Sequence, residues 1–516
     1  MPGCQAKPWF SKGVDLPEIQ QADVVIVGGG ITGISIGREL SRYQLSNVVV
    51  ERQADVAMGV SKTAGSLIYM GLFQAASLAI KDLSGQGDLR AETETERMRL
   101  LWQGFQDFDV LAHELDIDHS HVGVLFLARN KEEEDQLNRF SWLAQHIPGG
   151  TLTQLNREEL FALEPNLTPD AKRGLIDTTG TISVFGPEYV IALYENATAN
   201  GLQVLLGTEF IGLEKCPEGL LVQTSQGPIQ ARYVLNCTGK YADYSADRAG
   251  PGRDWNLSFY RSQALILDKS RAGTISNIVG IPPAPGKIDW LYPLGEGNIH
   301  VYGSNYDHIE DRDFTATTRE HFDDAIKRMQ ALVPSLTEKD VITSYVGVRV
   351  FNDKSVDEHL IESPQGNPLF LNVLVRMPGF TPSPPLARKV VGILADKGLN
   401  LEPKEEPFQT TRSAIPRFRF MFQNERDRLI DENPAYGRII CRCEQVTEGE
   451  IVEAIKRGAT TLQGIQFRTR AGMGRCQRNF CGAKIMDILA RELELAKQDV
   501  TYKGPGAELV TGGVAS

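Results

Sequence analysis

The hydrophobic pattern of the first fifty residues predicts a strand, a helix and a second strand. Residues 23–27 form a short apolar run rich in β-branched residues, which is typical of a buried parallel strand. Residues 34–40 have the spacing of apolar positions that a helix shows, and residues 47–50 predict another buried strand. The chain therefore begins with the elements of an α/β nucleotide-binding unit.

The C-terminal hundred residues have a different pattern, which predicts a linker and then a small module. Residues 402–436 are charged and proline-broken at first and then basic and aromatic, so we expect a linker whose apolar residues pack the module onto the main domain. Residues 447–450 have the sequence of a capping box and predict a helix over 451–457. We expect the module to span 437–498. The glycine-containing residues 499–516 are expected to be a flexible tail.

A glycine-rich loop connects the first strand to the first helix with the spacing of a dinucleotide-binding loop. Gly28 permits the tight turn, Gly30 lets the backbone approach a pyrophosphate, and Gly33 lets the helix pack on the strand. Glu51, after the second strand, suits a ribose hydroxyl, and the helix N-terminus suits the diphosphate. The alternative is a glycine-rich turn in an unrelated fold. The loop alone does not separate FAD from NAD.

Four of the seven cysteines lie in two close pairs, Cys441 with Cys443 and Cys476 with Cys481. In an acidic chain without an export signal, clustered thiols usually bind metal rather than form disulfides. Residues i and i+2 of an extended segment face the same side, so Cys441 and Cys443 can both reach one iron. The residues leave open an iron–sulfur cluster, a zinc site, whose usual spacing fits these pairs poorly, and a structural role without metal.

Composition and charge exclude several classes of partner. The chain has 516 residues and a net charge of -12, which argues against nucleic acid and anionic membranes. No apolar run approaches the roughly 20 residues that span a bilayer, and residues 1–10 lack the apolar core of a signal peptide. We expect a cytoplasmic homo- or hetero-oligomer that would reach the inner membrane, if at all, as a peripheral protein through a partner subunit.

Three further blocks resemble the glycine-oxidase and D-amino-acid-oxidase superfamily of FAD-dependent oxidoreductases. Residues 56–66 resemble its second FAD-contacting loop, residues 236–239 the turn where a strand returns to the nucleotide, and residues 377–387 its closing segment. The resemblance implies an α/β fold over residues 20–401, in which a Rossmann-like FAD-binding domain is interleaved with an antiparallel α+β substrate domain. It also places Phe210 near the adenine. The residues expected to contact FAD are Gly28, Gly29, Gly30, Ile31, Thr32, Gly33, Glu51, Arg52, Ser61, Lys62, Phe210, Gly239, Gly379, Phe380 and Thr381.

Residues 441–447 and 470–481 resemble the [2Fe-2S] module named after bacterioferritin-associated ferredoxin (BFD). Arg478 and Asn479 depart from the usual sequence between the last two ligands, without touching the ligands. The resemblance implies a small helical BFD-like module whose cluster ligands are Cys441, Cys443, Cys476 and Cys481.

An FAD domain followed by this module resembles the large subunits of anaerobic glycerol-3-phosphate dehydrogenases and also L-2-hydroxyglutarate dehydrogenases. The resemblance implies a dehydrogenase that oxidises a small anionic substrate by hydride transfer to FAD, with electrons leaving through the cluster to a protein or quinone acceptor. Arg349 matches the arginine that binds the substrate anion, and Tyr69 stands where the family commonly has a histidine base. His300 is a substitute base, and Arg261 matches a position near the flavin.

Other interpretations stay open. Tyrosine is a weak base near neutral pH, so Tyr69 favours an amine or imino-acid substrate as the alternative to an alcohol. The missing histidine is also the best argument for an electron-transfer subunit without substrate chemistry. Arg349 and the intact FAD blocks argue against that subunit. For Arg349 itself, the alternative is a structural ion pair. A cluster-sensing regulator lacks a recognisable DNA-reading element.

Overall fold

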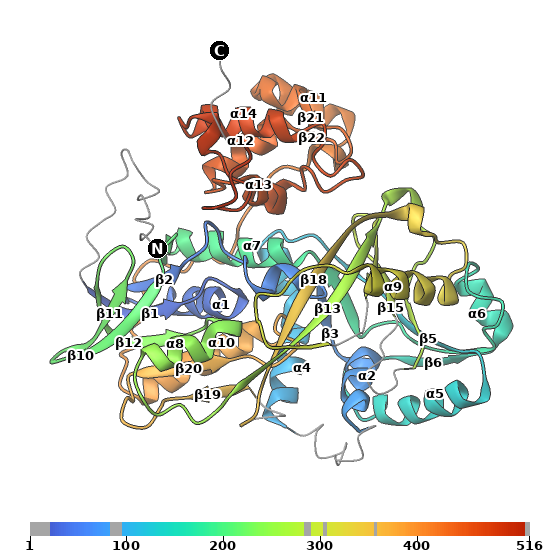
Figure 1. Ribbon diagram of the computed structural model, residues 1–516, viewed down its shortest axis with the longest axis horizontal. Helices are drawn as coiled ribbons and strands as arrows, with labels where there is room; N and C mark the ends of the chain where they lie inside the picture. Colours follow the sequence, from blue (N-terminus) through green and yellow to red (C-terminus); the bar gives the residue numbers. More distant parts are fainter. Residues whose placement is uncertain (1–20, 83–94, 283–289, 303–306, 355–358, 511–516) are drawn as a thin grey trace.

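The computed structural model describes residues 21–82, 95–282, 290–302, 307–354 and 359–510 of the chain. Figure 1 shows a large α/β body and a small, mainly helical module that rests beside helix α7 (Gly186–Ala199). Residue 20 of the expected main domain and residues 511–516 of the expected tail lie outside the described residues.

The first sheet forms the nucleotide-binding half of the body. Its strands follow the order β10-β11-β12-β1-β2-β9, and β20 and β19 extend it from β12. The pairs β1–β12, β1–β2, β2–β9 and β12–β20 are parallel, as a Rossmann-like sheet requires. The strands of this sheet are β1 (Gln21–Val27), β2 (Asn47–Glu51), β9 (Gln203–Leu206), β10 (Phe210–Cys216), β11 (Gly219–Thr224), β12 (Ile229–Asn236), β19 (Leu360–Glu362) and β20 (Phe370–Leu374).

The second sheet is mostly antiparallel and forms the other half of the body. Its long strand β13 pairs antiparallel with β16, β17 and β18, and the order continues from β16 through β15, β14, β5 and β7 to β6. The strands of this sheet are β5 (Val124–Ala128), β6 (Leu152–Leu155), β7 (Arg173–Asp177), β13 (Leu257–Leu267), β14 (Ile278–Gly280), β15 (Trp290–Pro293), β16 (Ile299–Tyr302), β17 (Asp307–Ile309) and β18 (Val341–Asn352).

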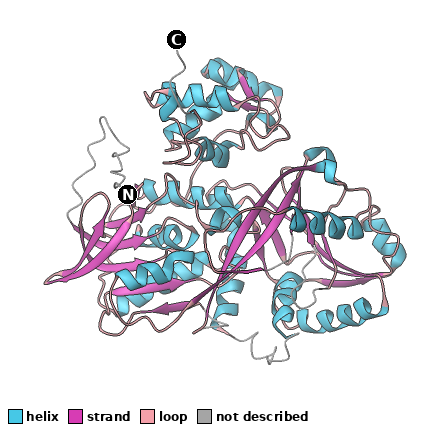
Figure 2. Cartoon of the chain, in the orientation of Figure 1, coloured by secondary structure: helices cyan, strands magenta, loops and turns pink. Residues whose placement is uncertain are grey.

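The chain passes repeatedly between the two halves, and this confirms the interleaved α/β fold expected from the sequence. It leaves the first sheet after β2, forms β5 to β7 of the second, returns for β9 to β12 and later closes the first sheet with β20. A small third sheet lies on the connections and consists of β3 (Leu67–Tyr69), β4 (His119–His121) and β8 (Thr181–Val184). Figure 2 shows the helices gathered around these sheets.

The alternation of side chains along β1 explains why this strand is apolar throughout. Val24 and Ile26 belong to the core beneath α1 (Ile31–Leu40), whereas Val25 and Val27 belong to the core on the opposite face. Helix α1 packs against α7 and α10 (Ser383–Asp396) on the first of these faces. The remaining helices of the body are α2 (Gly71–Asp82), α4 (Glu96–Glu114), α5 (Lys131–Ala144), α6 (Arg157–Leu163), α8 (Ala242–Arg248) and α9 (Arg319–Leu332).

The C-terminal module has a hydrophobic core of its own. Ile451, Ile465, Ile485 and Leu489 are buried together in it. The expected capping box is present, since the Glu450 N–H donates to the Thr447 hydroxyl at 3.2 Å. Its elements are α11 (Gln423–Glu432), β21 (Ile439–Cys441), β22 (Val446–Thr447), α12 (Glu448–Lys456), α13 (Leu462–Thr469) and α14 (Gly482–Glu492).

Residues 499–510 pack against the module, although the sequence led us to expect a flexible tail. Val500 and Thr501 are each 1% exposed. The Leu462 and Gln463 N–H groups donate to the carbonyl oxygens of Thr501 and Tyr502 at 3.2 and 2.8 Å. The glycines of this segment therefore form turns that fold it back onto the N-terminal end of α13.

The linker makes its contacts through arginines more than through apolar residues. Ile415 is buried in the core of the module as expected, but Phe420 and Phe422 are 59% and 77% exposed. Arg412 instead pairs with Glu195 of α7 at 2.6 Å, and Arg417 pairs with Glu188 of the same helix. The basic residues of the linker thus dock it on acidic residues of the main domain.

Among the described residues, no helix combines the length and the apolar character needed to cross a lipid bilayer.

Two helical glycines give a matched test of the packing between α4 and the segment that precedes α10. A methyl group on Gly104 of α4 would collide with the Thr381 carbonyl oxygen, whereas one on Gly392 of α10 meets nothing within 4 Å. We expect Gly104→Ala to lower the free energy of unfolding by about 1–3 kcal/mol. Gly392→Ala should raise it by up to about 1 kcal/mol, because alanine favours the helix. Denaturant unfolding followed by flavin release measures both, and equal effects of the two changes would contradict the close packing.

Candidate active site

The glycine loop is built for a close backbone approach. Gly28 has a φ of +111°, and a Cβ there would lie 2.6 Å from the Cys237 carbonyl oxygen. A Cβ on Gly33 would collide with the Gly28 carbonyl oxygen. Only glycine fits both positions, so the loop lies flat against the turn that follows β12 and leaves its outer side to a ligand.

Polar groups from two other segments lie at this loop. The Ile31 N–H, at the first turn of α1, donates to the Ser61 hydroxyl at 3.1 Å. The Gly29 and Gln53 N–H groups donate to the Glu51 carboxylate at 2.7 and 2.8 Å, and burial raises the pKa of Glu51. Ser61 and Glu51 therefore lie at the N-terminus of α1, where a dinucleotide phosphate and ribose would bind.

The returning turn and the closing segment meet the same region. The Cys237 N–H donates to the Val27 carbonyl oxygen at 2.9 Å, and Gly239 just beyond it has a φ of +59°. The Tyr69 N–H donates to the Thr381 hydroxyl at 3.2 Å. The ring of Phe380 packs so closely on Gly186 that a Cβ there would lie 2.6 Å from it. The blocks identified separately in the sequence thus converge around the glycine loop.

Three other residues expected to contact FAD lie at the edges of this region. Arg52 stacks on the ring of Tyr241, with its guanidinium carbon 3.9 Å from the ring centroid. Phe210 is buried in the core below β1 and β2. Burial, followed by the nearby Lys503 and Lys240, lowers the pKa of Lys62 to about 8. An anionic cofactor would compensate this concentration of positive charge.

The second sheet places the half-buried Arg349 in a group of aromatic residues. Arg349 lies on β18 and donates to the hydroxyl of Tyr302 on β16, and burial lowers its pKa to about 10. Tyr69 and Tyr292 lie close enough to stabilise its charge. The Tyr292 hydroxyl lies 3.6 Å from where a Cβ of Gly65 would be, so the group borders the second nucleotide loop.

His300 belongs to the same group but is a weak base. Its Nε2 is hydrogen-bonded to the Tyr345 hydroxyl at 3.0 Å, and its ring packs edge-on against Tyr292 at 4.6 Å. Burial lowers the pKa of His300 to about 3, so the ring is neutral near neutral pH. The structure thus brings Arg349, Tyr69 and His300 together, with the histidine packed among tyrosines.

Arg261, which the sequence led us to expect near the flavin, does not join this group. In the β13–β18 pair it stands opposite Val348, so it points to the face of the sheet opposite to that of Arg349. There it donates to the Ala316 carbonyl oxygen at 3.0 Å and lies 3.5 Å from the Asp307 carboxylate. Its surroundings are those of a buried structural arginine.

The four C-terminal thiols come together as two pairs. Cys441 interacts with Cys481, and Cys443 with Cys476. The hydrogen bond from the Cys481 thiol lowers the pKa of Cys441 to about 6, and the same contact raises that of Cys481. Cys441 and Cys481 are buried, whereas Cys443 is exposed.

The glycines of the second cysteine loop make room for these thiols. The Gly472 N–H donates to the Cys441 sulfur at 3.4 Å, and a Cβ on Gly474 would collide with that of Cys443. Among the described residues, no three His, Cys, Asp or Glu side chains are arranged to hold a single metal ion. Two thiol pairs wrapped by glycine backbone suit a binuclear cluster better than one zinc ion.

Comparison with known proteins identifies both parts of the chain. Residues 23–392 match the family model described as "FAD dependent oxidoreductase" (DAO). The chain belongs to this family. Residues 439–491 match the model described as "BFD-like [2Fe-2S] binding domain". The protein is thus a DAO-family oxidoreductase whose cofactors are FAD and a [2Fe-2S] cluster, and the residues described above fit both groups.

Relatives of this DAO-family protein match it over most of its length. It is 31% identical over 497 residues to a glycerol 3-phosphate dehydrogenase of Caloramator mitchellensis, covering 95% of this chain and 98% of that protein. It is 23% identical to one of the subunits of the anaerobic glycerol-3-phosphate dehydrogenase of Escherichia coli K12, over 92% of this chain and 88% of that one. An FAD-bound L-alpha-glycerophosphate oxidase of Mycoplasma pneumoniae has a similar fold, with a TM-score of 0.65 at 21% identity, over 76% of this chain and 98% of that one.

Apart from Tyr69, sequence reasoning missed the tyrosines near Arg349. Tyr302 follows His300 by two residues on one strand, and Tyr345 precedes Arg349 by four on another, so strand alternation places each on the same face as its neighbour. The alternation of side chains along each strand could therefore have predicted Tyr302 and Tyr345. Tyr292 could not be predicted in this way, because its closeness to Arg349 depends on the order of strands in the sheet.

Serine substitutions test the cluster ligands. Changing any of Cys441, Cys443, Cys476 or Cys481 should abolish the red-brown absorbance and lower the iron and sulfide content from two each per chain. FAD should stay bound, because its loops lie in the main domain. Cys216→Ser on β10 is the control and should keep both chromophores. Stoichiometric zinc in protein purified without oxygen would contradict the assignment.

Proposed function

We propose that this DAO-family protein is a dehydrogenase of a small anionic alcohol of the glycerol 3-phosphate or 2-hydroxy-acid type. The observation that carries the proposal is the half-buried Arg349, which lies among tyrosines and close to the second nucleotide loop. The named activities of the full-length relatives from Caloramator mitchellensis and Escherichia coli support it.

Arg349 has the properties of an anion-binding residue. Burial disfavours its charged form, as the pKa of about 10 indicates, and a bound phosphate or carboxylate would compensate that cost. The planar guanidinium presents forked donors to two oxygens of such an anion, which orients the substrate as well as binding it. The Tyr302 hydroxyl accepts from the same guanidinium and thereby fixes its direction.

The neighbouring residues would complete the substrate site. Tyr69 on β3 is held by its backbone bond to Thr381, so its position is tied to the closing segment of the FAD site. His300 is kept neutral by burial, and its hydrogen bond to Tyr345 holds the ring in one orientation. Bound FAD supplies a hydride acceptor, and the bound [2Fe-2S] cluster a one-electron carrier.

We propose that electrons leave through the cluster to a partner protein or a quinone-reducing subunit. The exposed Cys443 gives one side of the cluster site access to such a partner. One relative is described as a subunit of a larger dehydrogenase, which supports a hetero-oligomer and, through that partner, peripheral attachment to the inner membrane of an otherwise cytoplasmic protein.

A second candidate is the oxidation of an amine or imino acid. The group around Arg349 holds tyrosines and a histidine whose pKa is about 3, so none of its members is a strong base at neutral pH. An amine that reacts in its unprotonated form does not require one. An electron-transfer subunit without substrate chemistry is less consistent with an arginine placed among tyrosines beside the second nucleotide loop.

An anaerobic substrate screen tests the proposal. Glycerol 3-phosphate, 2-hydroxy acids and N-methyl amino acids are mixed separately with the oxidised holoenzyme, and flavin bleaching is followed. We expect rapid bleaching by one of the anionic alcohols and subsequent reduction of a one-electron dye, with slow reduction of oxygen. Bleaching by the amino acids alone would establish the second candidate, and no bleaching by any compound would favour an electron-transfer subunit.

Substitution of Arg349 tests the anion contact. Arg349→Lys keeps the charge but loses the forked donors, so we expect kcat/KM to fall roughly ten- to hundredfold, which corresponds to about 1.5–3 kcal/mol. The matched control is Arg261→Lys, on the opposite face of the same strand pair, which should leave KM unchanged. Steady-state kinetics with the substrate found in the screen measure both. Unchanged kinetics in Arg349→Lys would refute the anion-binding role.

A further inference from the structure

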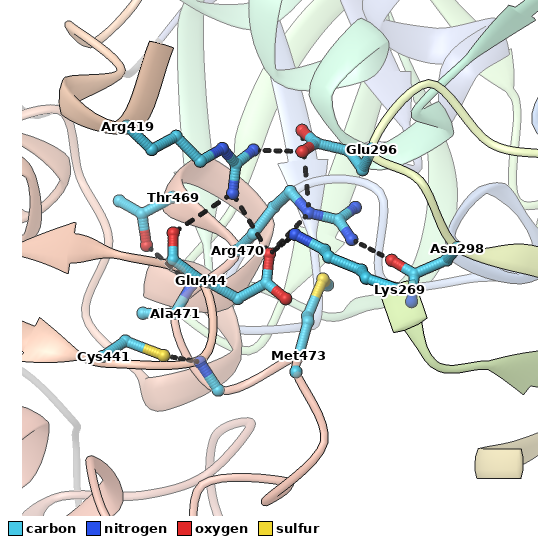
Figure 3. Close-up of polar contacts among 12 residues, drawn as sticks. Lys269, Glu296, Asn298, Arg419, Cys441, Glu444, Thr469, Arg470, Ala471 and Met473 are labelled. Atoms are coloured by element: carbon cyan, nitrogen blue, oxygen red, sulfur yellow. Dashed lines mark hydrogen bonds and ion pairs between the residues drawn. The ribbon is translucent and has the colours of Figure 1, made fainter. Parts of the chain in front are cut away.

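A buried ionic network joins the [2Fe-2S] module to the substrate half of the main domain (Figure 3). At its centre is Glu444, whose side chain is 0% exposed. One of its oxygens, Oε2, lies 2.6 Å from Lys269 Nζ, 3.1 Å from Arg419 and 3.4 Å from Arg470. Lys269 comes from the main domain, Arg419 from the linker and Arg470 from the module, so three parts of the chain converge on one oxygen.

The main domain supplies a second carboxylate and an amide to the same network. Glu296 pairs with Arg419 and lies 3.6 Å from Arg470. Arg470 also donates to the Asn298 side-chain oxygen at 3.0 Å, and the Asn298 amide donates to the Leu267 carbonyl oxygen at 2.8 Å. Both ends of the Asn298 side chain are therefore used, one towards the module and one towards the end of β13.

Within the module, the network is adjacent to both cluster loops. Glu444 directly follows the ligand Cys443. Arg470, in a left-handed conformation with a φ of +66°, ends α13 and stands two residues before Gly472, whose N–H donates to the Cys441 sulfur. Figure 3 shows Cys441 below the ion pairs. A shift of either residue would move a cluster ligand or the backbone that surrounds it.

Within the main domain, the network is adjacent to the strands that carry Arg349 and the aromatic residues around it. Lys269 follows β13, and Glu296 and Asn298 form the turn directly before β16. β16 carries His300 and Tyr302, which surround Arg349. The turn that contains Glu296 and Asn298 therefore contacts the module, and it also leads directly into β16, the strand that carries His300 and Tyr302.

The docking of the module on the main domain depends on every member of this network, because its charges are buried. A buried ion pair adds little stability over an apolar contact, but removing one partner leaves an uncompensated charge that is costly to bury. The second Glu444 oxygen, Oε1, is buried without a hydrogen-bond partner among the residues that the structure describes, so this carboxylate depends on its Oε2 contacts. Such a network favours one docked position over neighbouring ones, whereas domains joined by a linker alone usually move relative to each other.

We propose that Lys269, Glu444 and Arg470 are positioning residues for electron transfer from the flavin to the cluster, and the inference rests on the electron path proposed above. The two electrons of the reduced flavin leave in successive one-electron steps. The bound cluster would carry one electron at a time to an acceptor such as ferricenium, two acceptors would be reduced for each reduced flavin, and the flavin protons would pass to solvent. The network holds the cluster loops at one fixed place on the main domain while this happens.

Lys269→Met is the decisive variant, because Lys269 lies in the main domain and contacts neither a cysteine ligand nor the Arg349 group. The holoenzyme is mixed anaerobically with glycerol 3-phosphate, or with the compound that bleaches the flavin in the screen. Flavin absorbance and the electron paramagnetic resonance signal of the reduced cluster are followed in time. We expect flavin bleaching within roughly twofold of wild type and cluster reduction slower by roughly tenfold or more, since the buried Glu444 loses its closest cation.

Two further variants separate positioning from other effects. Lys269→Arg keeps a cation at this place and should restore most of the transfer rate. Lys497→Met removes an ion pair of 2.7 Å to Asp487 that is exposed and lies within the module, and should behave as wild type. Hydrogen exchange of residues 294–298 and 470–476 in the oxidised holoenzyme gives a readout independent of substrate, and it should be faster in Lys269→Met only.

The outcomes are distinct. Cluster reduction at the wild-type rate in Lys269→Met, with unchanged hydrogen exchange, would overturn the positioning role. Loss of FAD or of the dithionite-reduced cluster signal in that variant would also overturn it, because the residue would then be needed for folding or assembly alone. A wild-type cluster that stays oxidised after the flavin has bleached would instead refute the proposed electron path itself.

Discussion

The close approach of two backbone segments at Gly28 is the constraint on which the flavin site depends. The loop after β1 can lie against the carbonyl oxygen of Cys237 only because Gly28 and Gly33 have no side chains. This contact fixes where α1 begins, and with it the N–H groups that Ser61 and Glu51 border. Residues 56–66 of the second nucleotide loop are followed by Tyr69, so the same contact also helps to position the residues around Arg349.

The second sheet positions the residues around Arg349 through the register in which its strands pair, and not through a close contact between backbones. Its strands β16 and β18 each pair with β13, and this arrangement brings Tyr302 and Arg349 together from segments about fifty residues apart. Burial then determines the chemistry of the group. It keeps His300 neutral and makes the charged form of Arg349 sensitive to a bound anion. The same desolvation underlies the anion binding proposed for Arg349 and the lack of a strong base beside it.

Local patterns predicted much of this molecule. The glycine loop, the apolar strand before it, the capping box at Thr447 and the paired cysteines are short segments whose physical role can be read from adjacent residues, and the fold agrees with them. What depends on long-range pairing was not predictable. The position of Arg261 is decided by its pairing with Val348, and the contacts of Arg417 and Arg419 by which acidic residues the main domain presents. Tyr502 was unexpected for the same reason, because its partners lie on α13.

The interleaved order of the strands also governs how the protein is made. β1 and β2 are among the first segments synthesised, but the sheet that they begin is completed only when β20 pairs with β12 and α10 packs on α1. Asn236 at the end of β12 and Asn372 on β20, hydrogen-bonded to each other at 2.9 Å, are 136 residues apart in the chain. The strands of the second sheet are synthesised after β2 and before β20. They must not pair with the edge of β12 that β20 later occupies. High contact order of this kind slows folding and exposes apolar strands, so cofactor insertion follows synthesis of nearly the whole flavin domain.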